Sequence, residues 1–288
     1  IILFLYSIVQ VSAQKLDSLC MQQLLVIGNM QAYHIEPPVF NKETNLQIMD
    51  LFLSKVDGRG LFLLSSDREK IRSLITENSA NDGYCDVINT CYLIFKNRSK
   101  QIDSMLLIIE AKPFVYNGKD SVTFIPKKAA RYYCDNLSDL RVRLDKRLKL
   151  DCLDYITKPA KEGEDVLKLS DPEMTAKQTE AKRRAIQRLK RQLDFYKDET
   201  NLKHHIGDCM SNSIALRCDP HSSYFNVYEK QVWDEALSGK EMSFGFYVGE
   251  NETGEIAISD LVPGGPAWKS NEIHEGDVLL AFQFEKEK

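Results

Sequence analysis

The stretch MSFGFYVGENETGEIAISDLVPGGPAWKSNEIHEGDVLLAF, residues 242–282, decides the fold class of this chain. Alternating apolar residues predict strands over Phe244–Val248 and Glu255–Val262, with a turn rich in Gly, Asn and Glu between them. A Pro-Gly-Gly-Pro run then ends the second strand, and Pro266 suits the first turn of a short helix. A last apolar strand is expected over Val278–Phe284, after a Gly-Asp turn. The stretch therefore predicts a small β module, of which we expect this sequence to hold the first half.

Residues 15–235, before the β module, carry apolar side chains at the spacing of helices. The clearest pattern ends at Gly58, a residue type that stops helices. Helices are expected over residues 17–30, 42–56, 67–75, 137–153, 173–196 and 202–216. Two short apolar segments, 87–95 and 102–109, are also expected to be buried helices, although runs of that length suit strands as well. The sequence therefore predicts an α+β protein, with a mainly helical N-terminal domain followed by the β module at 240–288.

Two stretches of the helical part are expected to lack regular structure. Residues 114–125 surround an Asn-Gly pair and predict a small hairpin or an extended loop. Residues 158–172 are polar, charged and interrupted by Pro and Gly, which is typical of a loose connector. Ser65 or Ser66 is expected to cap the helix that follows.

The first residues, IILFLYSIVQVSAQ, form an apolar run that ends in small residues. This pattern predicts a secretory signal peptide over residues 1–13, cut near Ala13, within which the given sequence is expected to begin. The run is far shorter than the roughly 20 residues of a membrane-spanning helix. A buried N-terminal helix is the alternative. Export is the expectation that follows from the signal peptide.

The overall charge gives no reason to expect a nucleic-acid or membrane partner. The formal net charge is -4, with 43% hydrophobic and 28% charged residues, as in ordinary globular proteins. The helix predicted over 173–196 does carry a basic face, which we interpret as a solvated surface rather than a nucleic-acid site. No nucleic acid is therefore expected as a partner.

Seven cysteines, none in a Cys-x-x-Cys pair, are compatible with disulfides in an exported protein. Cys85 with Cys91, and Cys209 with Cys218, are close enough in sequence to be candidate pairs. Unpaired buried cysteines are an equally open interpretation.

Two clusters of reactive side chains are not interpreted as catalytic or metal sites. Asp219, His221 and Ser222 or Ser223 are neighbours on one turn, whereas the members of a catalytic triad come from separated positions. His204, His205 and Cys209 have helical spacing, but zinc needs a third and a fourth ligand, so a surface histidine pair is favoured. No metal or cofactor is expected.

Four segments in the second half carry a family resemblance: CDPHSSYF (218–225), SFGFYVG (243–249), ISDLVPGGPAWKS (258–270) and EGDVLLAF (275–282). Together they resemble the C-terminal processing peptidases, also called tail-specific proteases. These are exported bacterial serine proteases with a Ser/Lys dyad and an embedded PDZ domain. A looser similarity reaches back to Tyr33-His34 and includes Asp57 and Asp67.

The resemblance implies that the chain is an N-terminal fragment of such a protease, with a helical domain and the first half of a PDZ domain. The Ser/Lys dyad of the family would then lie beyond Lys288, so no catalytic residue is expected here and the fragment is expected to be inactive. The PDZ loop and its following strand would bind a peptide C-terminus through Ser243, Phe244, Gly245, Phe246, Tyr247 and Val248. The family commonly has Gly where Ser243 stands.

The resemblance also implies partners and a location. Substrates would be proteins recognised by their C-terminal tails, in the periplasm or cell envelope of a bacterium, and an envelope lipoprotein adaptor is a further candidate partner. The alternative interpretation is a non-catalytic PDZ-containing adaptor or scaffold protein of the envelope. A third is an unrelated exported helical protein with a PDZ-like tail.

Overall fold

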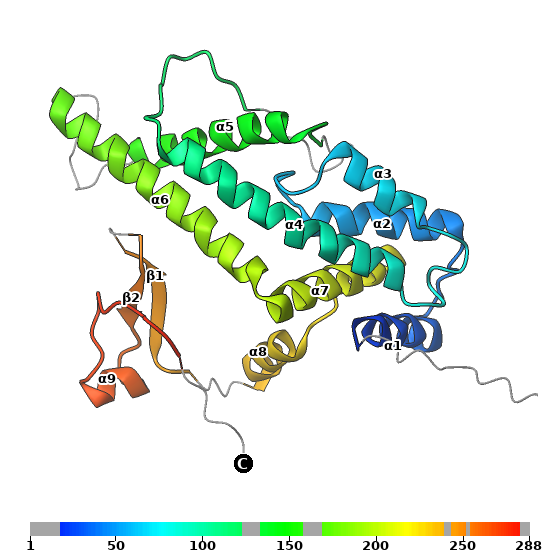
Figure 1. Cartoon of the computed structure of the whole chain (residues 1–288). Coiled ribbons are helices and arrows are strands. Elements are labelled where there is room, and N and C mark those ends of the chain that lie inside the picture. The colour runs from blue at the N-terminus through cyan, green and yellow to red at the C-terminus, as the bar shows by residue number, and fades with distance from the viewer. Residues whose placement is uncertain (1–17, 123–132, 158–168, 239–242, 252–253, 283–288) are drawn as a thin grey trace, which may run out of the picture. The chain divides into compact units, whose positions relative to one another are not determined.

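The computed structural model describes residues 18–122, 133–157, 169–238, 243–251 and 254–282. Along these residues the elements follow in the order α1 (Ser18–Tyr33), α2 (Lys42–Val56), α3 (Ser65–Ser73), α4 (Cys85–Glu110), α5 (Leu137–Ile156), α6 (Asp171–Lys197), α7 (Glu199–Cys218), α8 (Val227–Ser238), β1 (Phe246–Glu250), β2 (Ile256–Leu261) and α9 (Pro266–Ser270) (Figure 1). Helices dominate up to α8, and a two-stranded antiparallel sheet follows. The α+β class predicted from the sequence is therefore confirmed.

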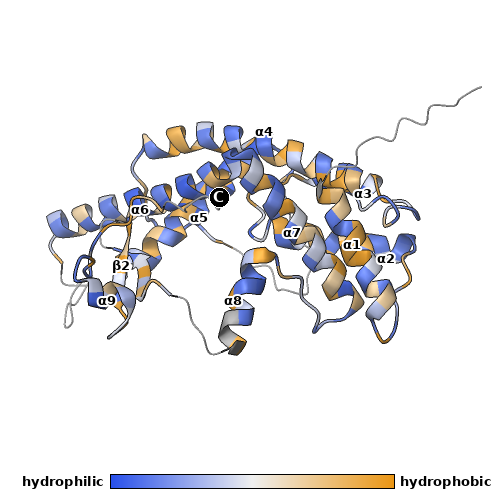
Figure 2. Ribbon diagram, turned by 90° about the horizontal axis from the view of Figure 1, so that it is seen from below, coloured by the Kyte–Doolittle hydropathy of each residue, from blue (hydrophilic) through white to orange (hydrophobic). Residues whose placement is uncertain are grey.

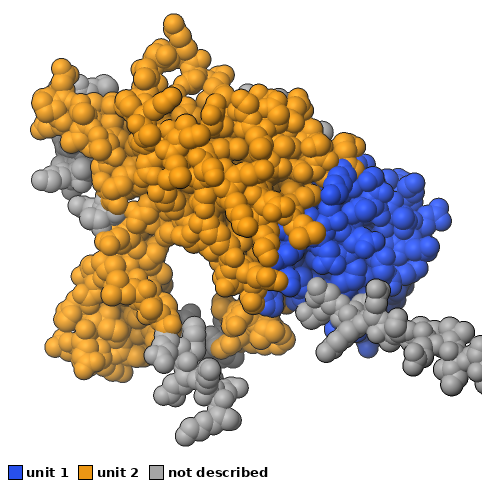
Figure 3. Space-filling view, viewed as in Figure 1, with its two compact units in different colours: residues 1–56, 70–92, 203–224 blue, residues 57–69, 93–202, 225–288 orange. Residues whose placement is uncertain are grey.

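The chain divides into two compact units, each assembled from segments that are far apart in the sequence (Figure 3). The first unit comprises residues 1–56, 70–92 and 203–224, and the second comprises residues 57–69, 93–202 and 225–288. Each unit buries its own set of apolar side chains. The domain boundaries expected from the sequence, 15–235 and 240–288, stay a prediction.

Buried polar side chains fix the helix pairing of the first unit. Asn45 on α2 is fully buried, and its amide donates to the Thr76 carbonyl at 2.9 Å and accepts from the Tyr84 hydroxyl at 2.8 Å. Gln23 on α1 is also fully buried and accepts from the Ser211 hydroxyl at 2.9 Å. Because a buried amide without partners is costly, these bonds favour this one packing of the helices over other arrangements.

A disulfide joins Cys20 on α1 to Cys85, the first residue of α4. Both pairs expected from the sequence are wrong, because Cys91, Cys209 and Cys218 are in no disulfide. Each expected pair lies along a single helix, α4 or α7. At a rise of 1.5 Å per residue the paired Cα atoms are about 9 Å and about 13 Å apart, beyond the roughly 7 Å that a disulfide spans.

In the second unit, α5 and α6 pack against each other and three aromatic rings fill the space near the α2–α3 turn. The ring centroids of Phe62 and Phe95 are 5.1 Å apart and stacked, and Tyr196 meets both edge-on at 5.2 and 5.9 Å. Hydrophobic and hydrophilic residues alternate along α5 and α6 (Figure 2). The buried face of α5 consists of Leu140, Leu144, Leu148, Cys152 and Ile156. The residues of the 3-4 repeat that predicted this helix thus form its buried face.

The turn between α2 and α3 is built around Asp57, whose side chain is 2% exposed. Its Oδ1 accepts from the backbone N–H of Leu61 at 2.9 Å, and its Oδ2 accepts from Phe62 at 3.0 Å and Leu63 at 2.8 Å. The three donors satisfy the carboxylate that burial removes from water. Asp57 therefore holds the apolar segment after it in place.

The start of α3 uses a second carboxylate. Asp67 accepts from the Leu64 backbone N–H at 2.9 Å and pairs with the Arg98 guanidinium at 2.5 Å. Ser65 is the first residue of the helix, and its hydroxyl donates to Asp135 at 2.9 Å. The cap expected at Ser65 or Ser66 is therefore wrong, because the helix already begins at Ser65 and it is Asp67, in the first turn, that accepts from the N–H of Leu64.

Helix α4 is continuous where two shorter helices were expected. Its polar middle stays helical because the side chains there have partners: Ser99 donates to the Phe95 carbonyl at 2.9 Å, and Arg98 pairs with Asp67. Both residues are buried. The gap in the apolar pattern thus marks a buried polar contact rather than a break in the helix.

Other boundaries also differ from the expectations. Helix α3 ends at Ser73, two residues earlier than predicted. Pro172, expected in the connector, lies in the first turn of α6, where Ser170 and Glu173 form a capping box. Helix α8 was not predicted, and Tyr228, Val232 and Trp233, which lie on one side of it, are exposed. Residues 113–122 form no strand within the part of the loop that the structure describes.

The β module consists of β1 and β2 with α9 after them. Phe246 pairs with Leu261 and Glu250 with Ile256, and the register shifts between Tyr247 and Val248. The strand predicted from Val278 is reduced to an isolated bridge to Ala257 and a hydrogen bond from the Leu279 N–H to the Ile256 carbonyl at 2.8 Å. Two more bonds precede this bridge, from the Ile258 N–H to the Asp277 carbonyl and from the Gly276 N–H to the Ile258 carbonyl, both at 2.9 Å. The described residues after Val278 form no regular strand.

Several expectations lie outside the described residues: the signal peptide at 1–13, residues 123–125 of the loop, most of the connector, and Phe284. Over the described helices, none combines the length and the apolar character that crossing a membrane requires.

Candidate functional site

The loop before β1 is centred on Gly245, whose φ is +80°. A Cβ atom at this position would lie 2.8 Å from Pro266 Cδ and 2.9 Å from Pro266 N. The Val262 N–H donates to the Gly245 carbonyl at 2.9 Å, and the Ala267 N–H donates to the Phe244 carbonyl at 3.0 Å. Only glycine combines this backbone conformation with this close approach. The segment from Val262 to Ala267 therefore holds the loop in place through these two hydrogen bonds and the contact with Pro266.

Three phenylalanines gather beside this loop. The rings of Phe244 and Phe246 stack with centroids 5.7 Å apart, and Phe282 stacks on Phe244 at the same distance. Phe244 is 62% exposed, so the cluster offers an apolar surface to solvent. The peptide-binding residues expected from the resemblance include Phe244 and Phe246 but not Phe282. The signal for Phe282 was the apolar run after Gly276, which was interpreted only as a strand.

Strand β1 has an open edge within the described part of the chain. It pairs with β2 on one side, and the sheet order is β1-β2. Tyr247 and Val248 in its middle are exposed. An open edge presents backbone N–H and C=O groups to which an extended peptide can add as a further strand. The loop, the aromatic cluster and this edge lie next to one another along one short segment.

Ser243 adds a feature that glycine at this position would lack. Its Oγ accepts a hydrogen bond from the Gly245 N–H at 3.0 Å. Successive N–H groups in such a turn form an anion-binding concavity. A terminal carboxylate that uses the Gly245 N–H would therefore have to displace the serine hydroxyl. The assignment of Ser243, Phe244, Gly245, Phe246, Tyr247 and Val248 to peptide binding stays a prediction.

The Asp219 turn does not form a catalytic triad. Ser222 donates its hydroxyl to Asp219 at 3.1 Å, and His221 Nδ1 lies 4.0 Å from the same carboxylate. The serine is thus bonded to the aspartate rather than to a histidine base, contrary to what a nucleophile requires. The His221 backbone N–H is the main cause of a lowered Asp219 pKa, followed in the same direction by the Ser222 hydroxyl. The carboxylate therefore has a turn-stabilising role.

His205 and Cys209 face each other on α7, with 3.9 Å between Nε2 and Sγ. Burial lowers the pKa of His205 and raises the pKa of Cys209 to about 12, so both are neutral at pH 7. Across the residues that the structure describes, no group of three or more His, Cys, Asp or Glu side chains could hold a metal ion.

Two comparisons with known proteins point to the same protein family, the tail-specific proteases. The family model described as the tail specific protease N-terminal domain matches residues 26–227. The chain is also similar to the tail-specific protease of Haemophilus influenzae, with 26% identity over 242 residues. That alignment covers 81% of this chain and 31% of the relative, so the chain spans about a third of the length of that curated relative.

Proposed function

Because this chain belongs to the tail specific protease N-terminal domain family, we propose that it is the substrate-recognition part of a tail-specific protease. Its β module would bind the C-terminal peptide of a protein substrate. The observation that carries this proposal is the Gly245 loop, packed on Pro266 and followed directly by the open edge of β1. Loop and edge together supply the two contacts that a peptide C-terminus needs.

The binding mode follows from the contacts of the loop. The last residues of the peptide would add to the edge of β1 by main-chain hydrogen bonds. The terminal carboxylate would accept hydrogen bonds from N–H groups of the loop. It would replace the Ser243 hydroxyl as the acceptor of the Gly245 N–H. Phe244, Phe246 and Phe282 would receive an apolar terminal side chain. Tyr247 and Val248 would contact the residues before it.

Peptide hydrolysis would take place elsewhere in the full-length protein. By family resemblance the reaction is a serine-type cleavage with a Ser/Lys dyad, and we assign neither residue to this chain. The polypeptide described here would bind substrates without cleaving them. Incubation of the purified chain with an unfolded tail peptide should leave the peptide intact, and turnover would contradict this assignment.

Export to the bacterial periplasm or envelope is part of the proposal. Residues 1–13 have the pattern of a signal peptide, and the disulfide between Cys20 and Cys85 belongs in an oxidising compartment. An envelope lipoprotein adaptor stays a candidate partner under this proposal. Fractionation of cells that express the natural gene should place the protein outside the cytoplasm.

A direct binding measurement tests the recognition step. A fluorescent unstructured peptide with a free carboxylate and an apolar last residue is titrated with the purified chain, beside the same peptide amidated at its C-terminus. We expect amidation to weaken binding about tenfold or more, because charge-assisted hydrogen bonds to the carboxylate are lost. Equal binding of the two peptides would contradict recognition of a free C-terminus.

The same geometry would serve a non-catalytic adaptor, which is the second candidate function. A peptide-binding loop and strand edge act alike in both cases, and only the fate of the bound peptide differs. Assay of the full-length natural protein decides between them, since a protease cleaves the bound tail and an adaptor releases it intact.

A further inference from the structure

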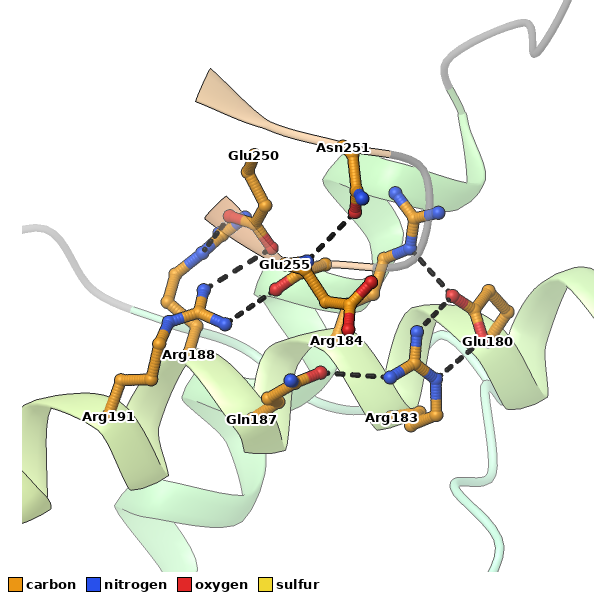
Figure 4. Close-up of polar contacts among 10 residues, drawn as sticks. Glu180, Arg183, Arg184, Gln187, Arg188, Arg191, Glu250, Asn251 and Glu255 are labelled. Atoms are coloured by element: carbon orange, nitrogen blue, oxygen red, sulfur yellow. Dashed lines mark hydrogen bonds and ion pairs between the residues drawn. The ribbon is translucent and has the colours of Figure 1, made fainter. Parts of the chain in front are cut away.

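One face of α6 lies against the residues at the two ends of the β1–β2 turn (Figure 4). Arg188 donates to the Glu250 carboxylate, at 3.0 Å from Nη2 and 3.3 Å from Nε. Arg191 lies 3.5 Å from the other oxygen of Glu250 and donates to the Gly254 carbonyl at 2.6 Å. Two arginines one helical turn apart thus hold both ends of one turn.

The backbone of the turn comes equally close to the helix. A Cβ atom at Gly254 would lie 3.3 Å from Arg184 Cγ and 3.3 Å from Gln187 Oε1. Gly254 has a φ of +77°, which also favours glycine. The contact therefore includes packing of backbone on side chains as well as charge.

The turn has an internal structure that shapes it for this contact. Asn251 accepts from the Glu255 N–H through its side chain at 2.9 Å, and its backbone N–H donates to the Glu255 carbonyl at 2.8 Å. The Gly254 N–H donates to the Asn251 carbonyl at 3.0 Å. These bonds hold the Gly254 carbonyl and the Glu250 side chain in fixed places.

Other charged residues of α6 form ion pairs with helical residues. Arg183 and Arg184 both bind Glu180, at 2.7 and 2.8 Å. Lys190 binds Glu110 on α4 at 2.8 Å. The basic face of α6 is thus divided: part of it joins helices, and Arg188 with Arg191 reaches the β module. The sequence interpretation of this face as solvated surface did not foresee that division.

We propose that Arg188, Arg191, Glu250 and Gly254 form an electrostatic latch that ties the β module to α6 and opens at high ionic strength. Arg188 is 57% exposed and Glu250 is 24% exposed, so each pair is weak and screened by salt. The latch occupies the last residue of β1, whereas Gly245 precedes its first. The open edge of β1 thus runs between the latch and the loop. The latch depends on none of the peptide-binding assignments.

Charge reversal at Arg188 and Arg191, made in the whole chain, tests the latch. Amide hydrogen exchange over residues 246–261 is measured for the unchanged protein and for the double variant Arg188→Glu, Arg191→Glu. We expect exchange about tenfold faster in the variant, as the loss of two exposed pairs plus repulsion between carboxylates implies. Adding Glu250→Arg to the double variant should slow exchange again, although not fully, because the bond to the Gly254 carbonyl is not restored.

Lys190→Glu is the matched control, because it breaks an exposed ion pair on the same helix without touching the turn. Exchange over 246–261 should be unchanged in this control. Raising NaCl to 0.5 M should speed exchange in the unchanged protein and slow it in the double variant, where salt screens the repulsion between carboxylates, since the Debye length is then only about 4 Å. Protection over α5 in the same spectra reports whether each variant is folded.

Two results would overturn the proposal: equal exchange in the double variant and the unchanged protein, or an equal acceleration by Lys190→Glu. A variant that loses the latch and still binds the tail peptide separates this proposal from the proposed function, because the two rest on different measurements.

Discussion

Two turns of this protein are each organised by one carboxylate, and they differ in burial. Asp57 in the α2–α3 turn is 2% exposed and accepts three backbone N–H groups. Glu250 at the β1–β2 turn is partly exposed, accepts hydrogen bonds from the Arg188 guanidinium and forms an ion pair with Arg191, and both arginines are themselves partly exposed. The same chemical group is thus a fixed structural element in one place and a releasable contact in the other.

Access to water explains why one turn is fixed and the other can be released. A buried carboxylate cannot recover its lost hydration, so removing its partners leaves several polar groups unsatisfied. An exposed pair exchanges one set of hydrogen bonds for water with little net change. Burial, rather than the number of hydrogen bonds, therefore decides which turn can open without unfolding the protein.

The sharpest test of the comparison is Asp57→Ala. We expect it to lower the free energy of unfolding by about 3–5 kcal/mol, because three buried N–H groups lose their acceptor. Asp50→Ala is the control, since Asp50 is exposed and pairs with Arg72. It should cost less than about 1 kcal/mol. Urea unfolding followed by circular dichroism measures both, and equal effects would contradict the role given to burial.

Gly245→Ala should have the next largest effect, on the β module alone. A positive φ and a contact of 2.8 Å with Pro266 together predict a local cost of about 2–4 kcal/mol. Gly264→Ala is the matched control, because Gly264 has a φ of +76° but open space around its Cβ position. Hydrogen exchange of β1 and β2 should therefore rise more for Gly245→Ala. The reverse order would show that the close approach to Pro266 does not matter.

Ser243→Ala should strengthen peptide binding by about threefold to tenfold. Removal of the hydroxyl leaves the Gly245 N–H available to the peptide carboxylate, and one hydrogen bond is worth about 0.5–1.5 kcal/mol. Ser270→Ala, in the same module but bonded to the Ala267 carbonyl, is the control. Fluorescence anisotropy with the free and amidated peptides measures the change. Weaker binding in Ser243→Ala would indicate that the hydroxyl itself contacts the ligand.

The smallest effect is expected at Glu180, a partly exposed carboxylate on α6. The Arg183 hydrogen bond is the main reason that the Glu180 pKa falls to about 2 from its ordinary 4.5, with Arg184 acting in the same direction. A lowered folded-state pKa means stability that is present above pH 4.5 and lost as the pH falls towards 2. The difference in unfolding free energy between the unchanged protein and Glu180→Gln should shrink across this range, by less than about 1 kcal/mol. A difference that grows on acidification would contradict the ion-pair explanation.

Local patterns predicted most of the helices and the centre of the candidate site. The repeats behind α2, α5, α6 and α7 are read from neighbouring residues, so one sequence suffices to find them. Gly245 and Pro266 were identified through a run of motifs, and the structure adds the physical reason, which is their contact. Ser243 was noted as a departure, and its hydrogen bond to Gly245 explains what the departure changes.

Features that join distant residues were not predictable in this way. The Cys20–Cys85 disulfide spans 65 residues, and Arg188 pairs with a carboxylate 62 residues away. No spacing rule links such positions before the fold is known. Phe282 was missed for a related reason, because its ring joins the cluster through packing rather than through strand alternation. Helix α8 was missed although Tyr228, Val232 and Trp233 have helical spacing, because its 12 residues give only a short pattern.

The disulfide between Cys20 and Cys85 makes the stability of the first unit depend on the compartment. Closing a loop of this length removes about 4 kcal/mol of chain entropy from the unfolded state, in the chain-entropy model. Under reducing conditions the same polypeptide lacks that contribution, and its first unit is correspondingly less stable. Oxidation ties α1 covalently to α4, so the first unit reaches its full stability only in oxidising surroundings.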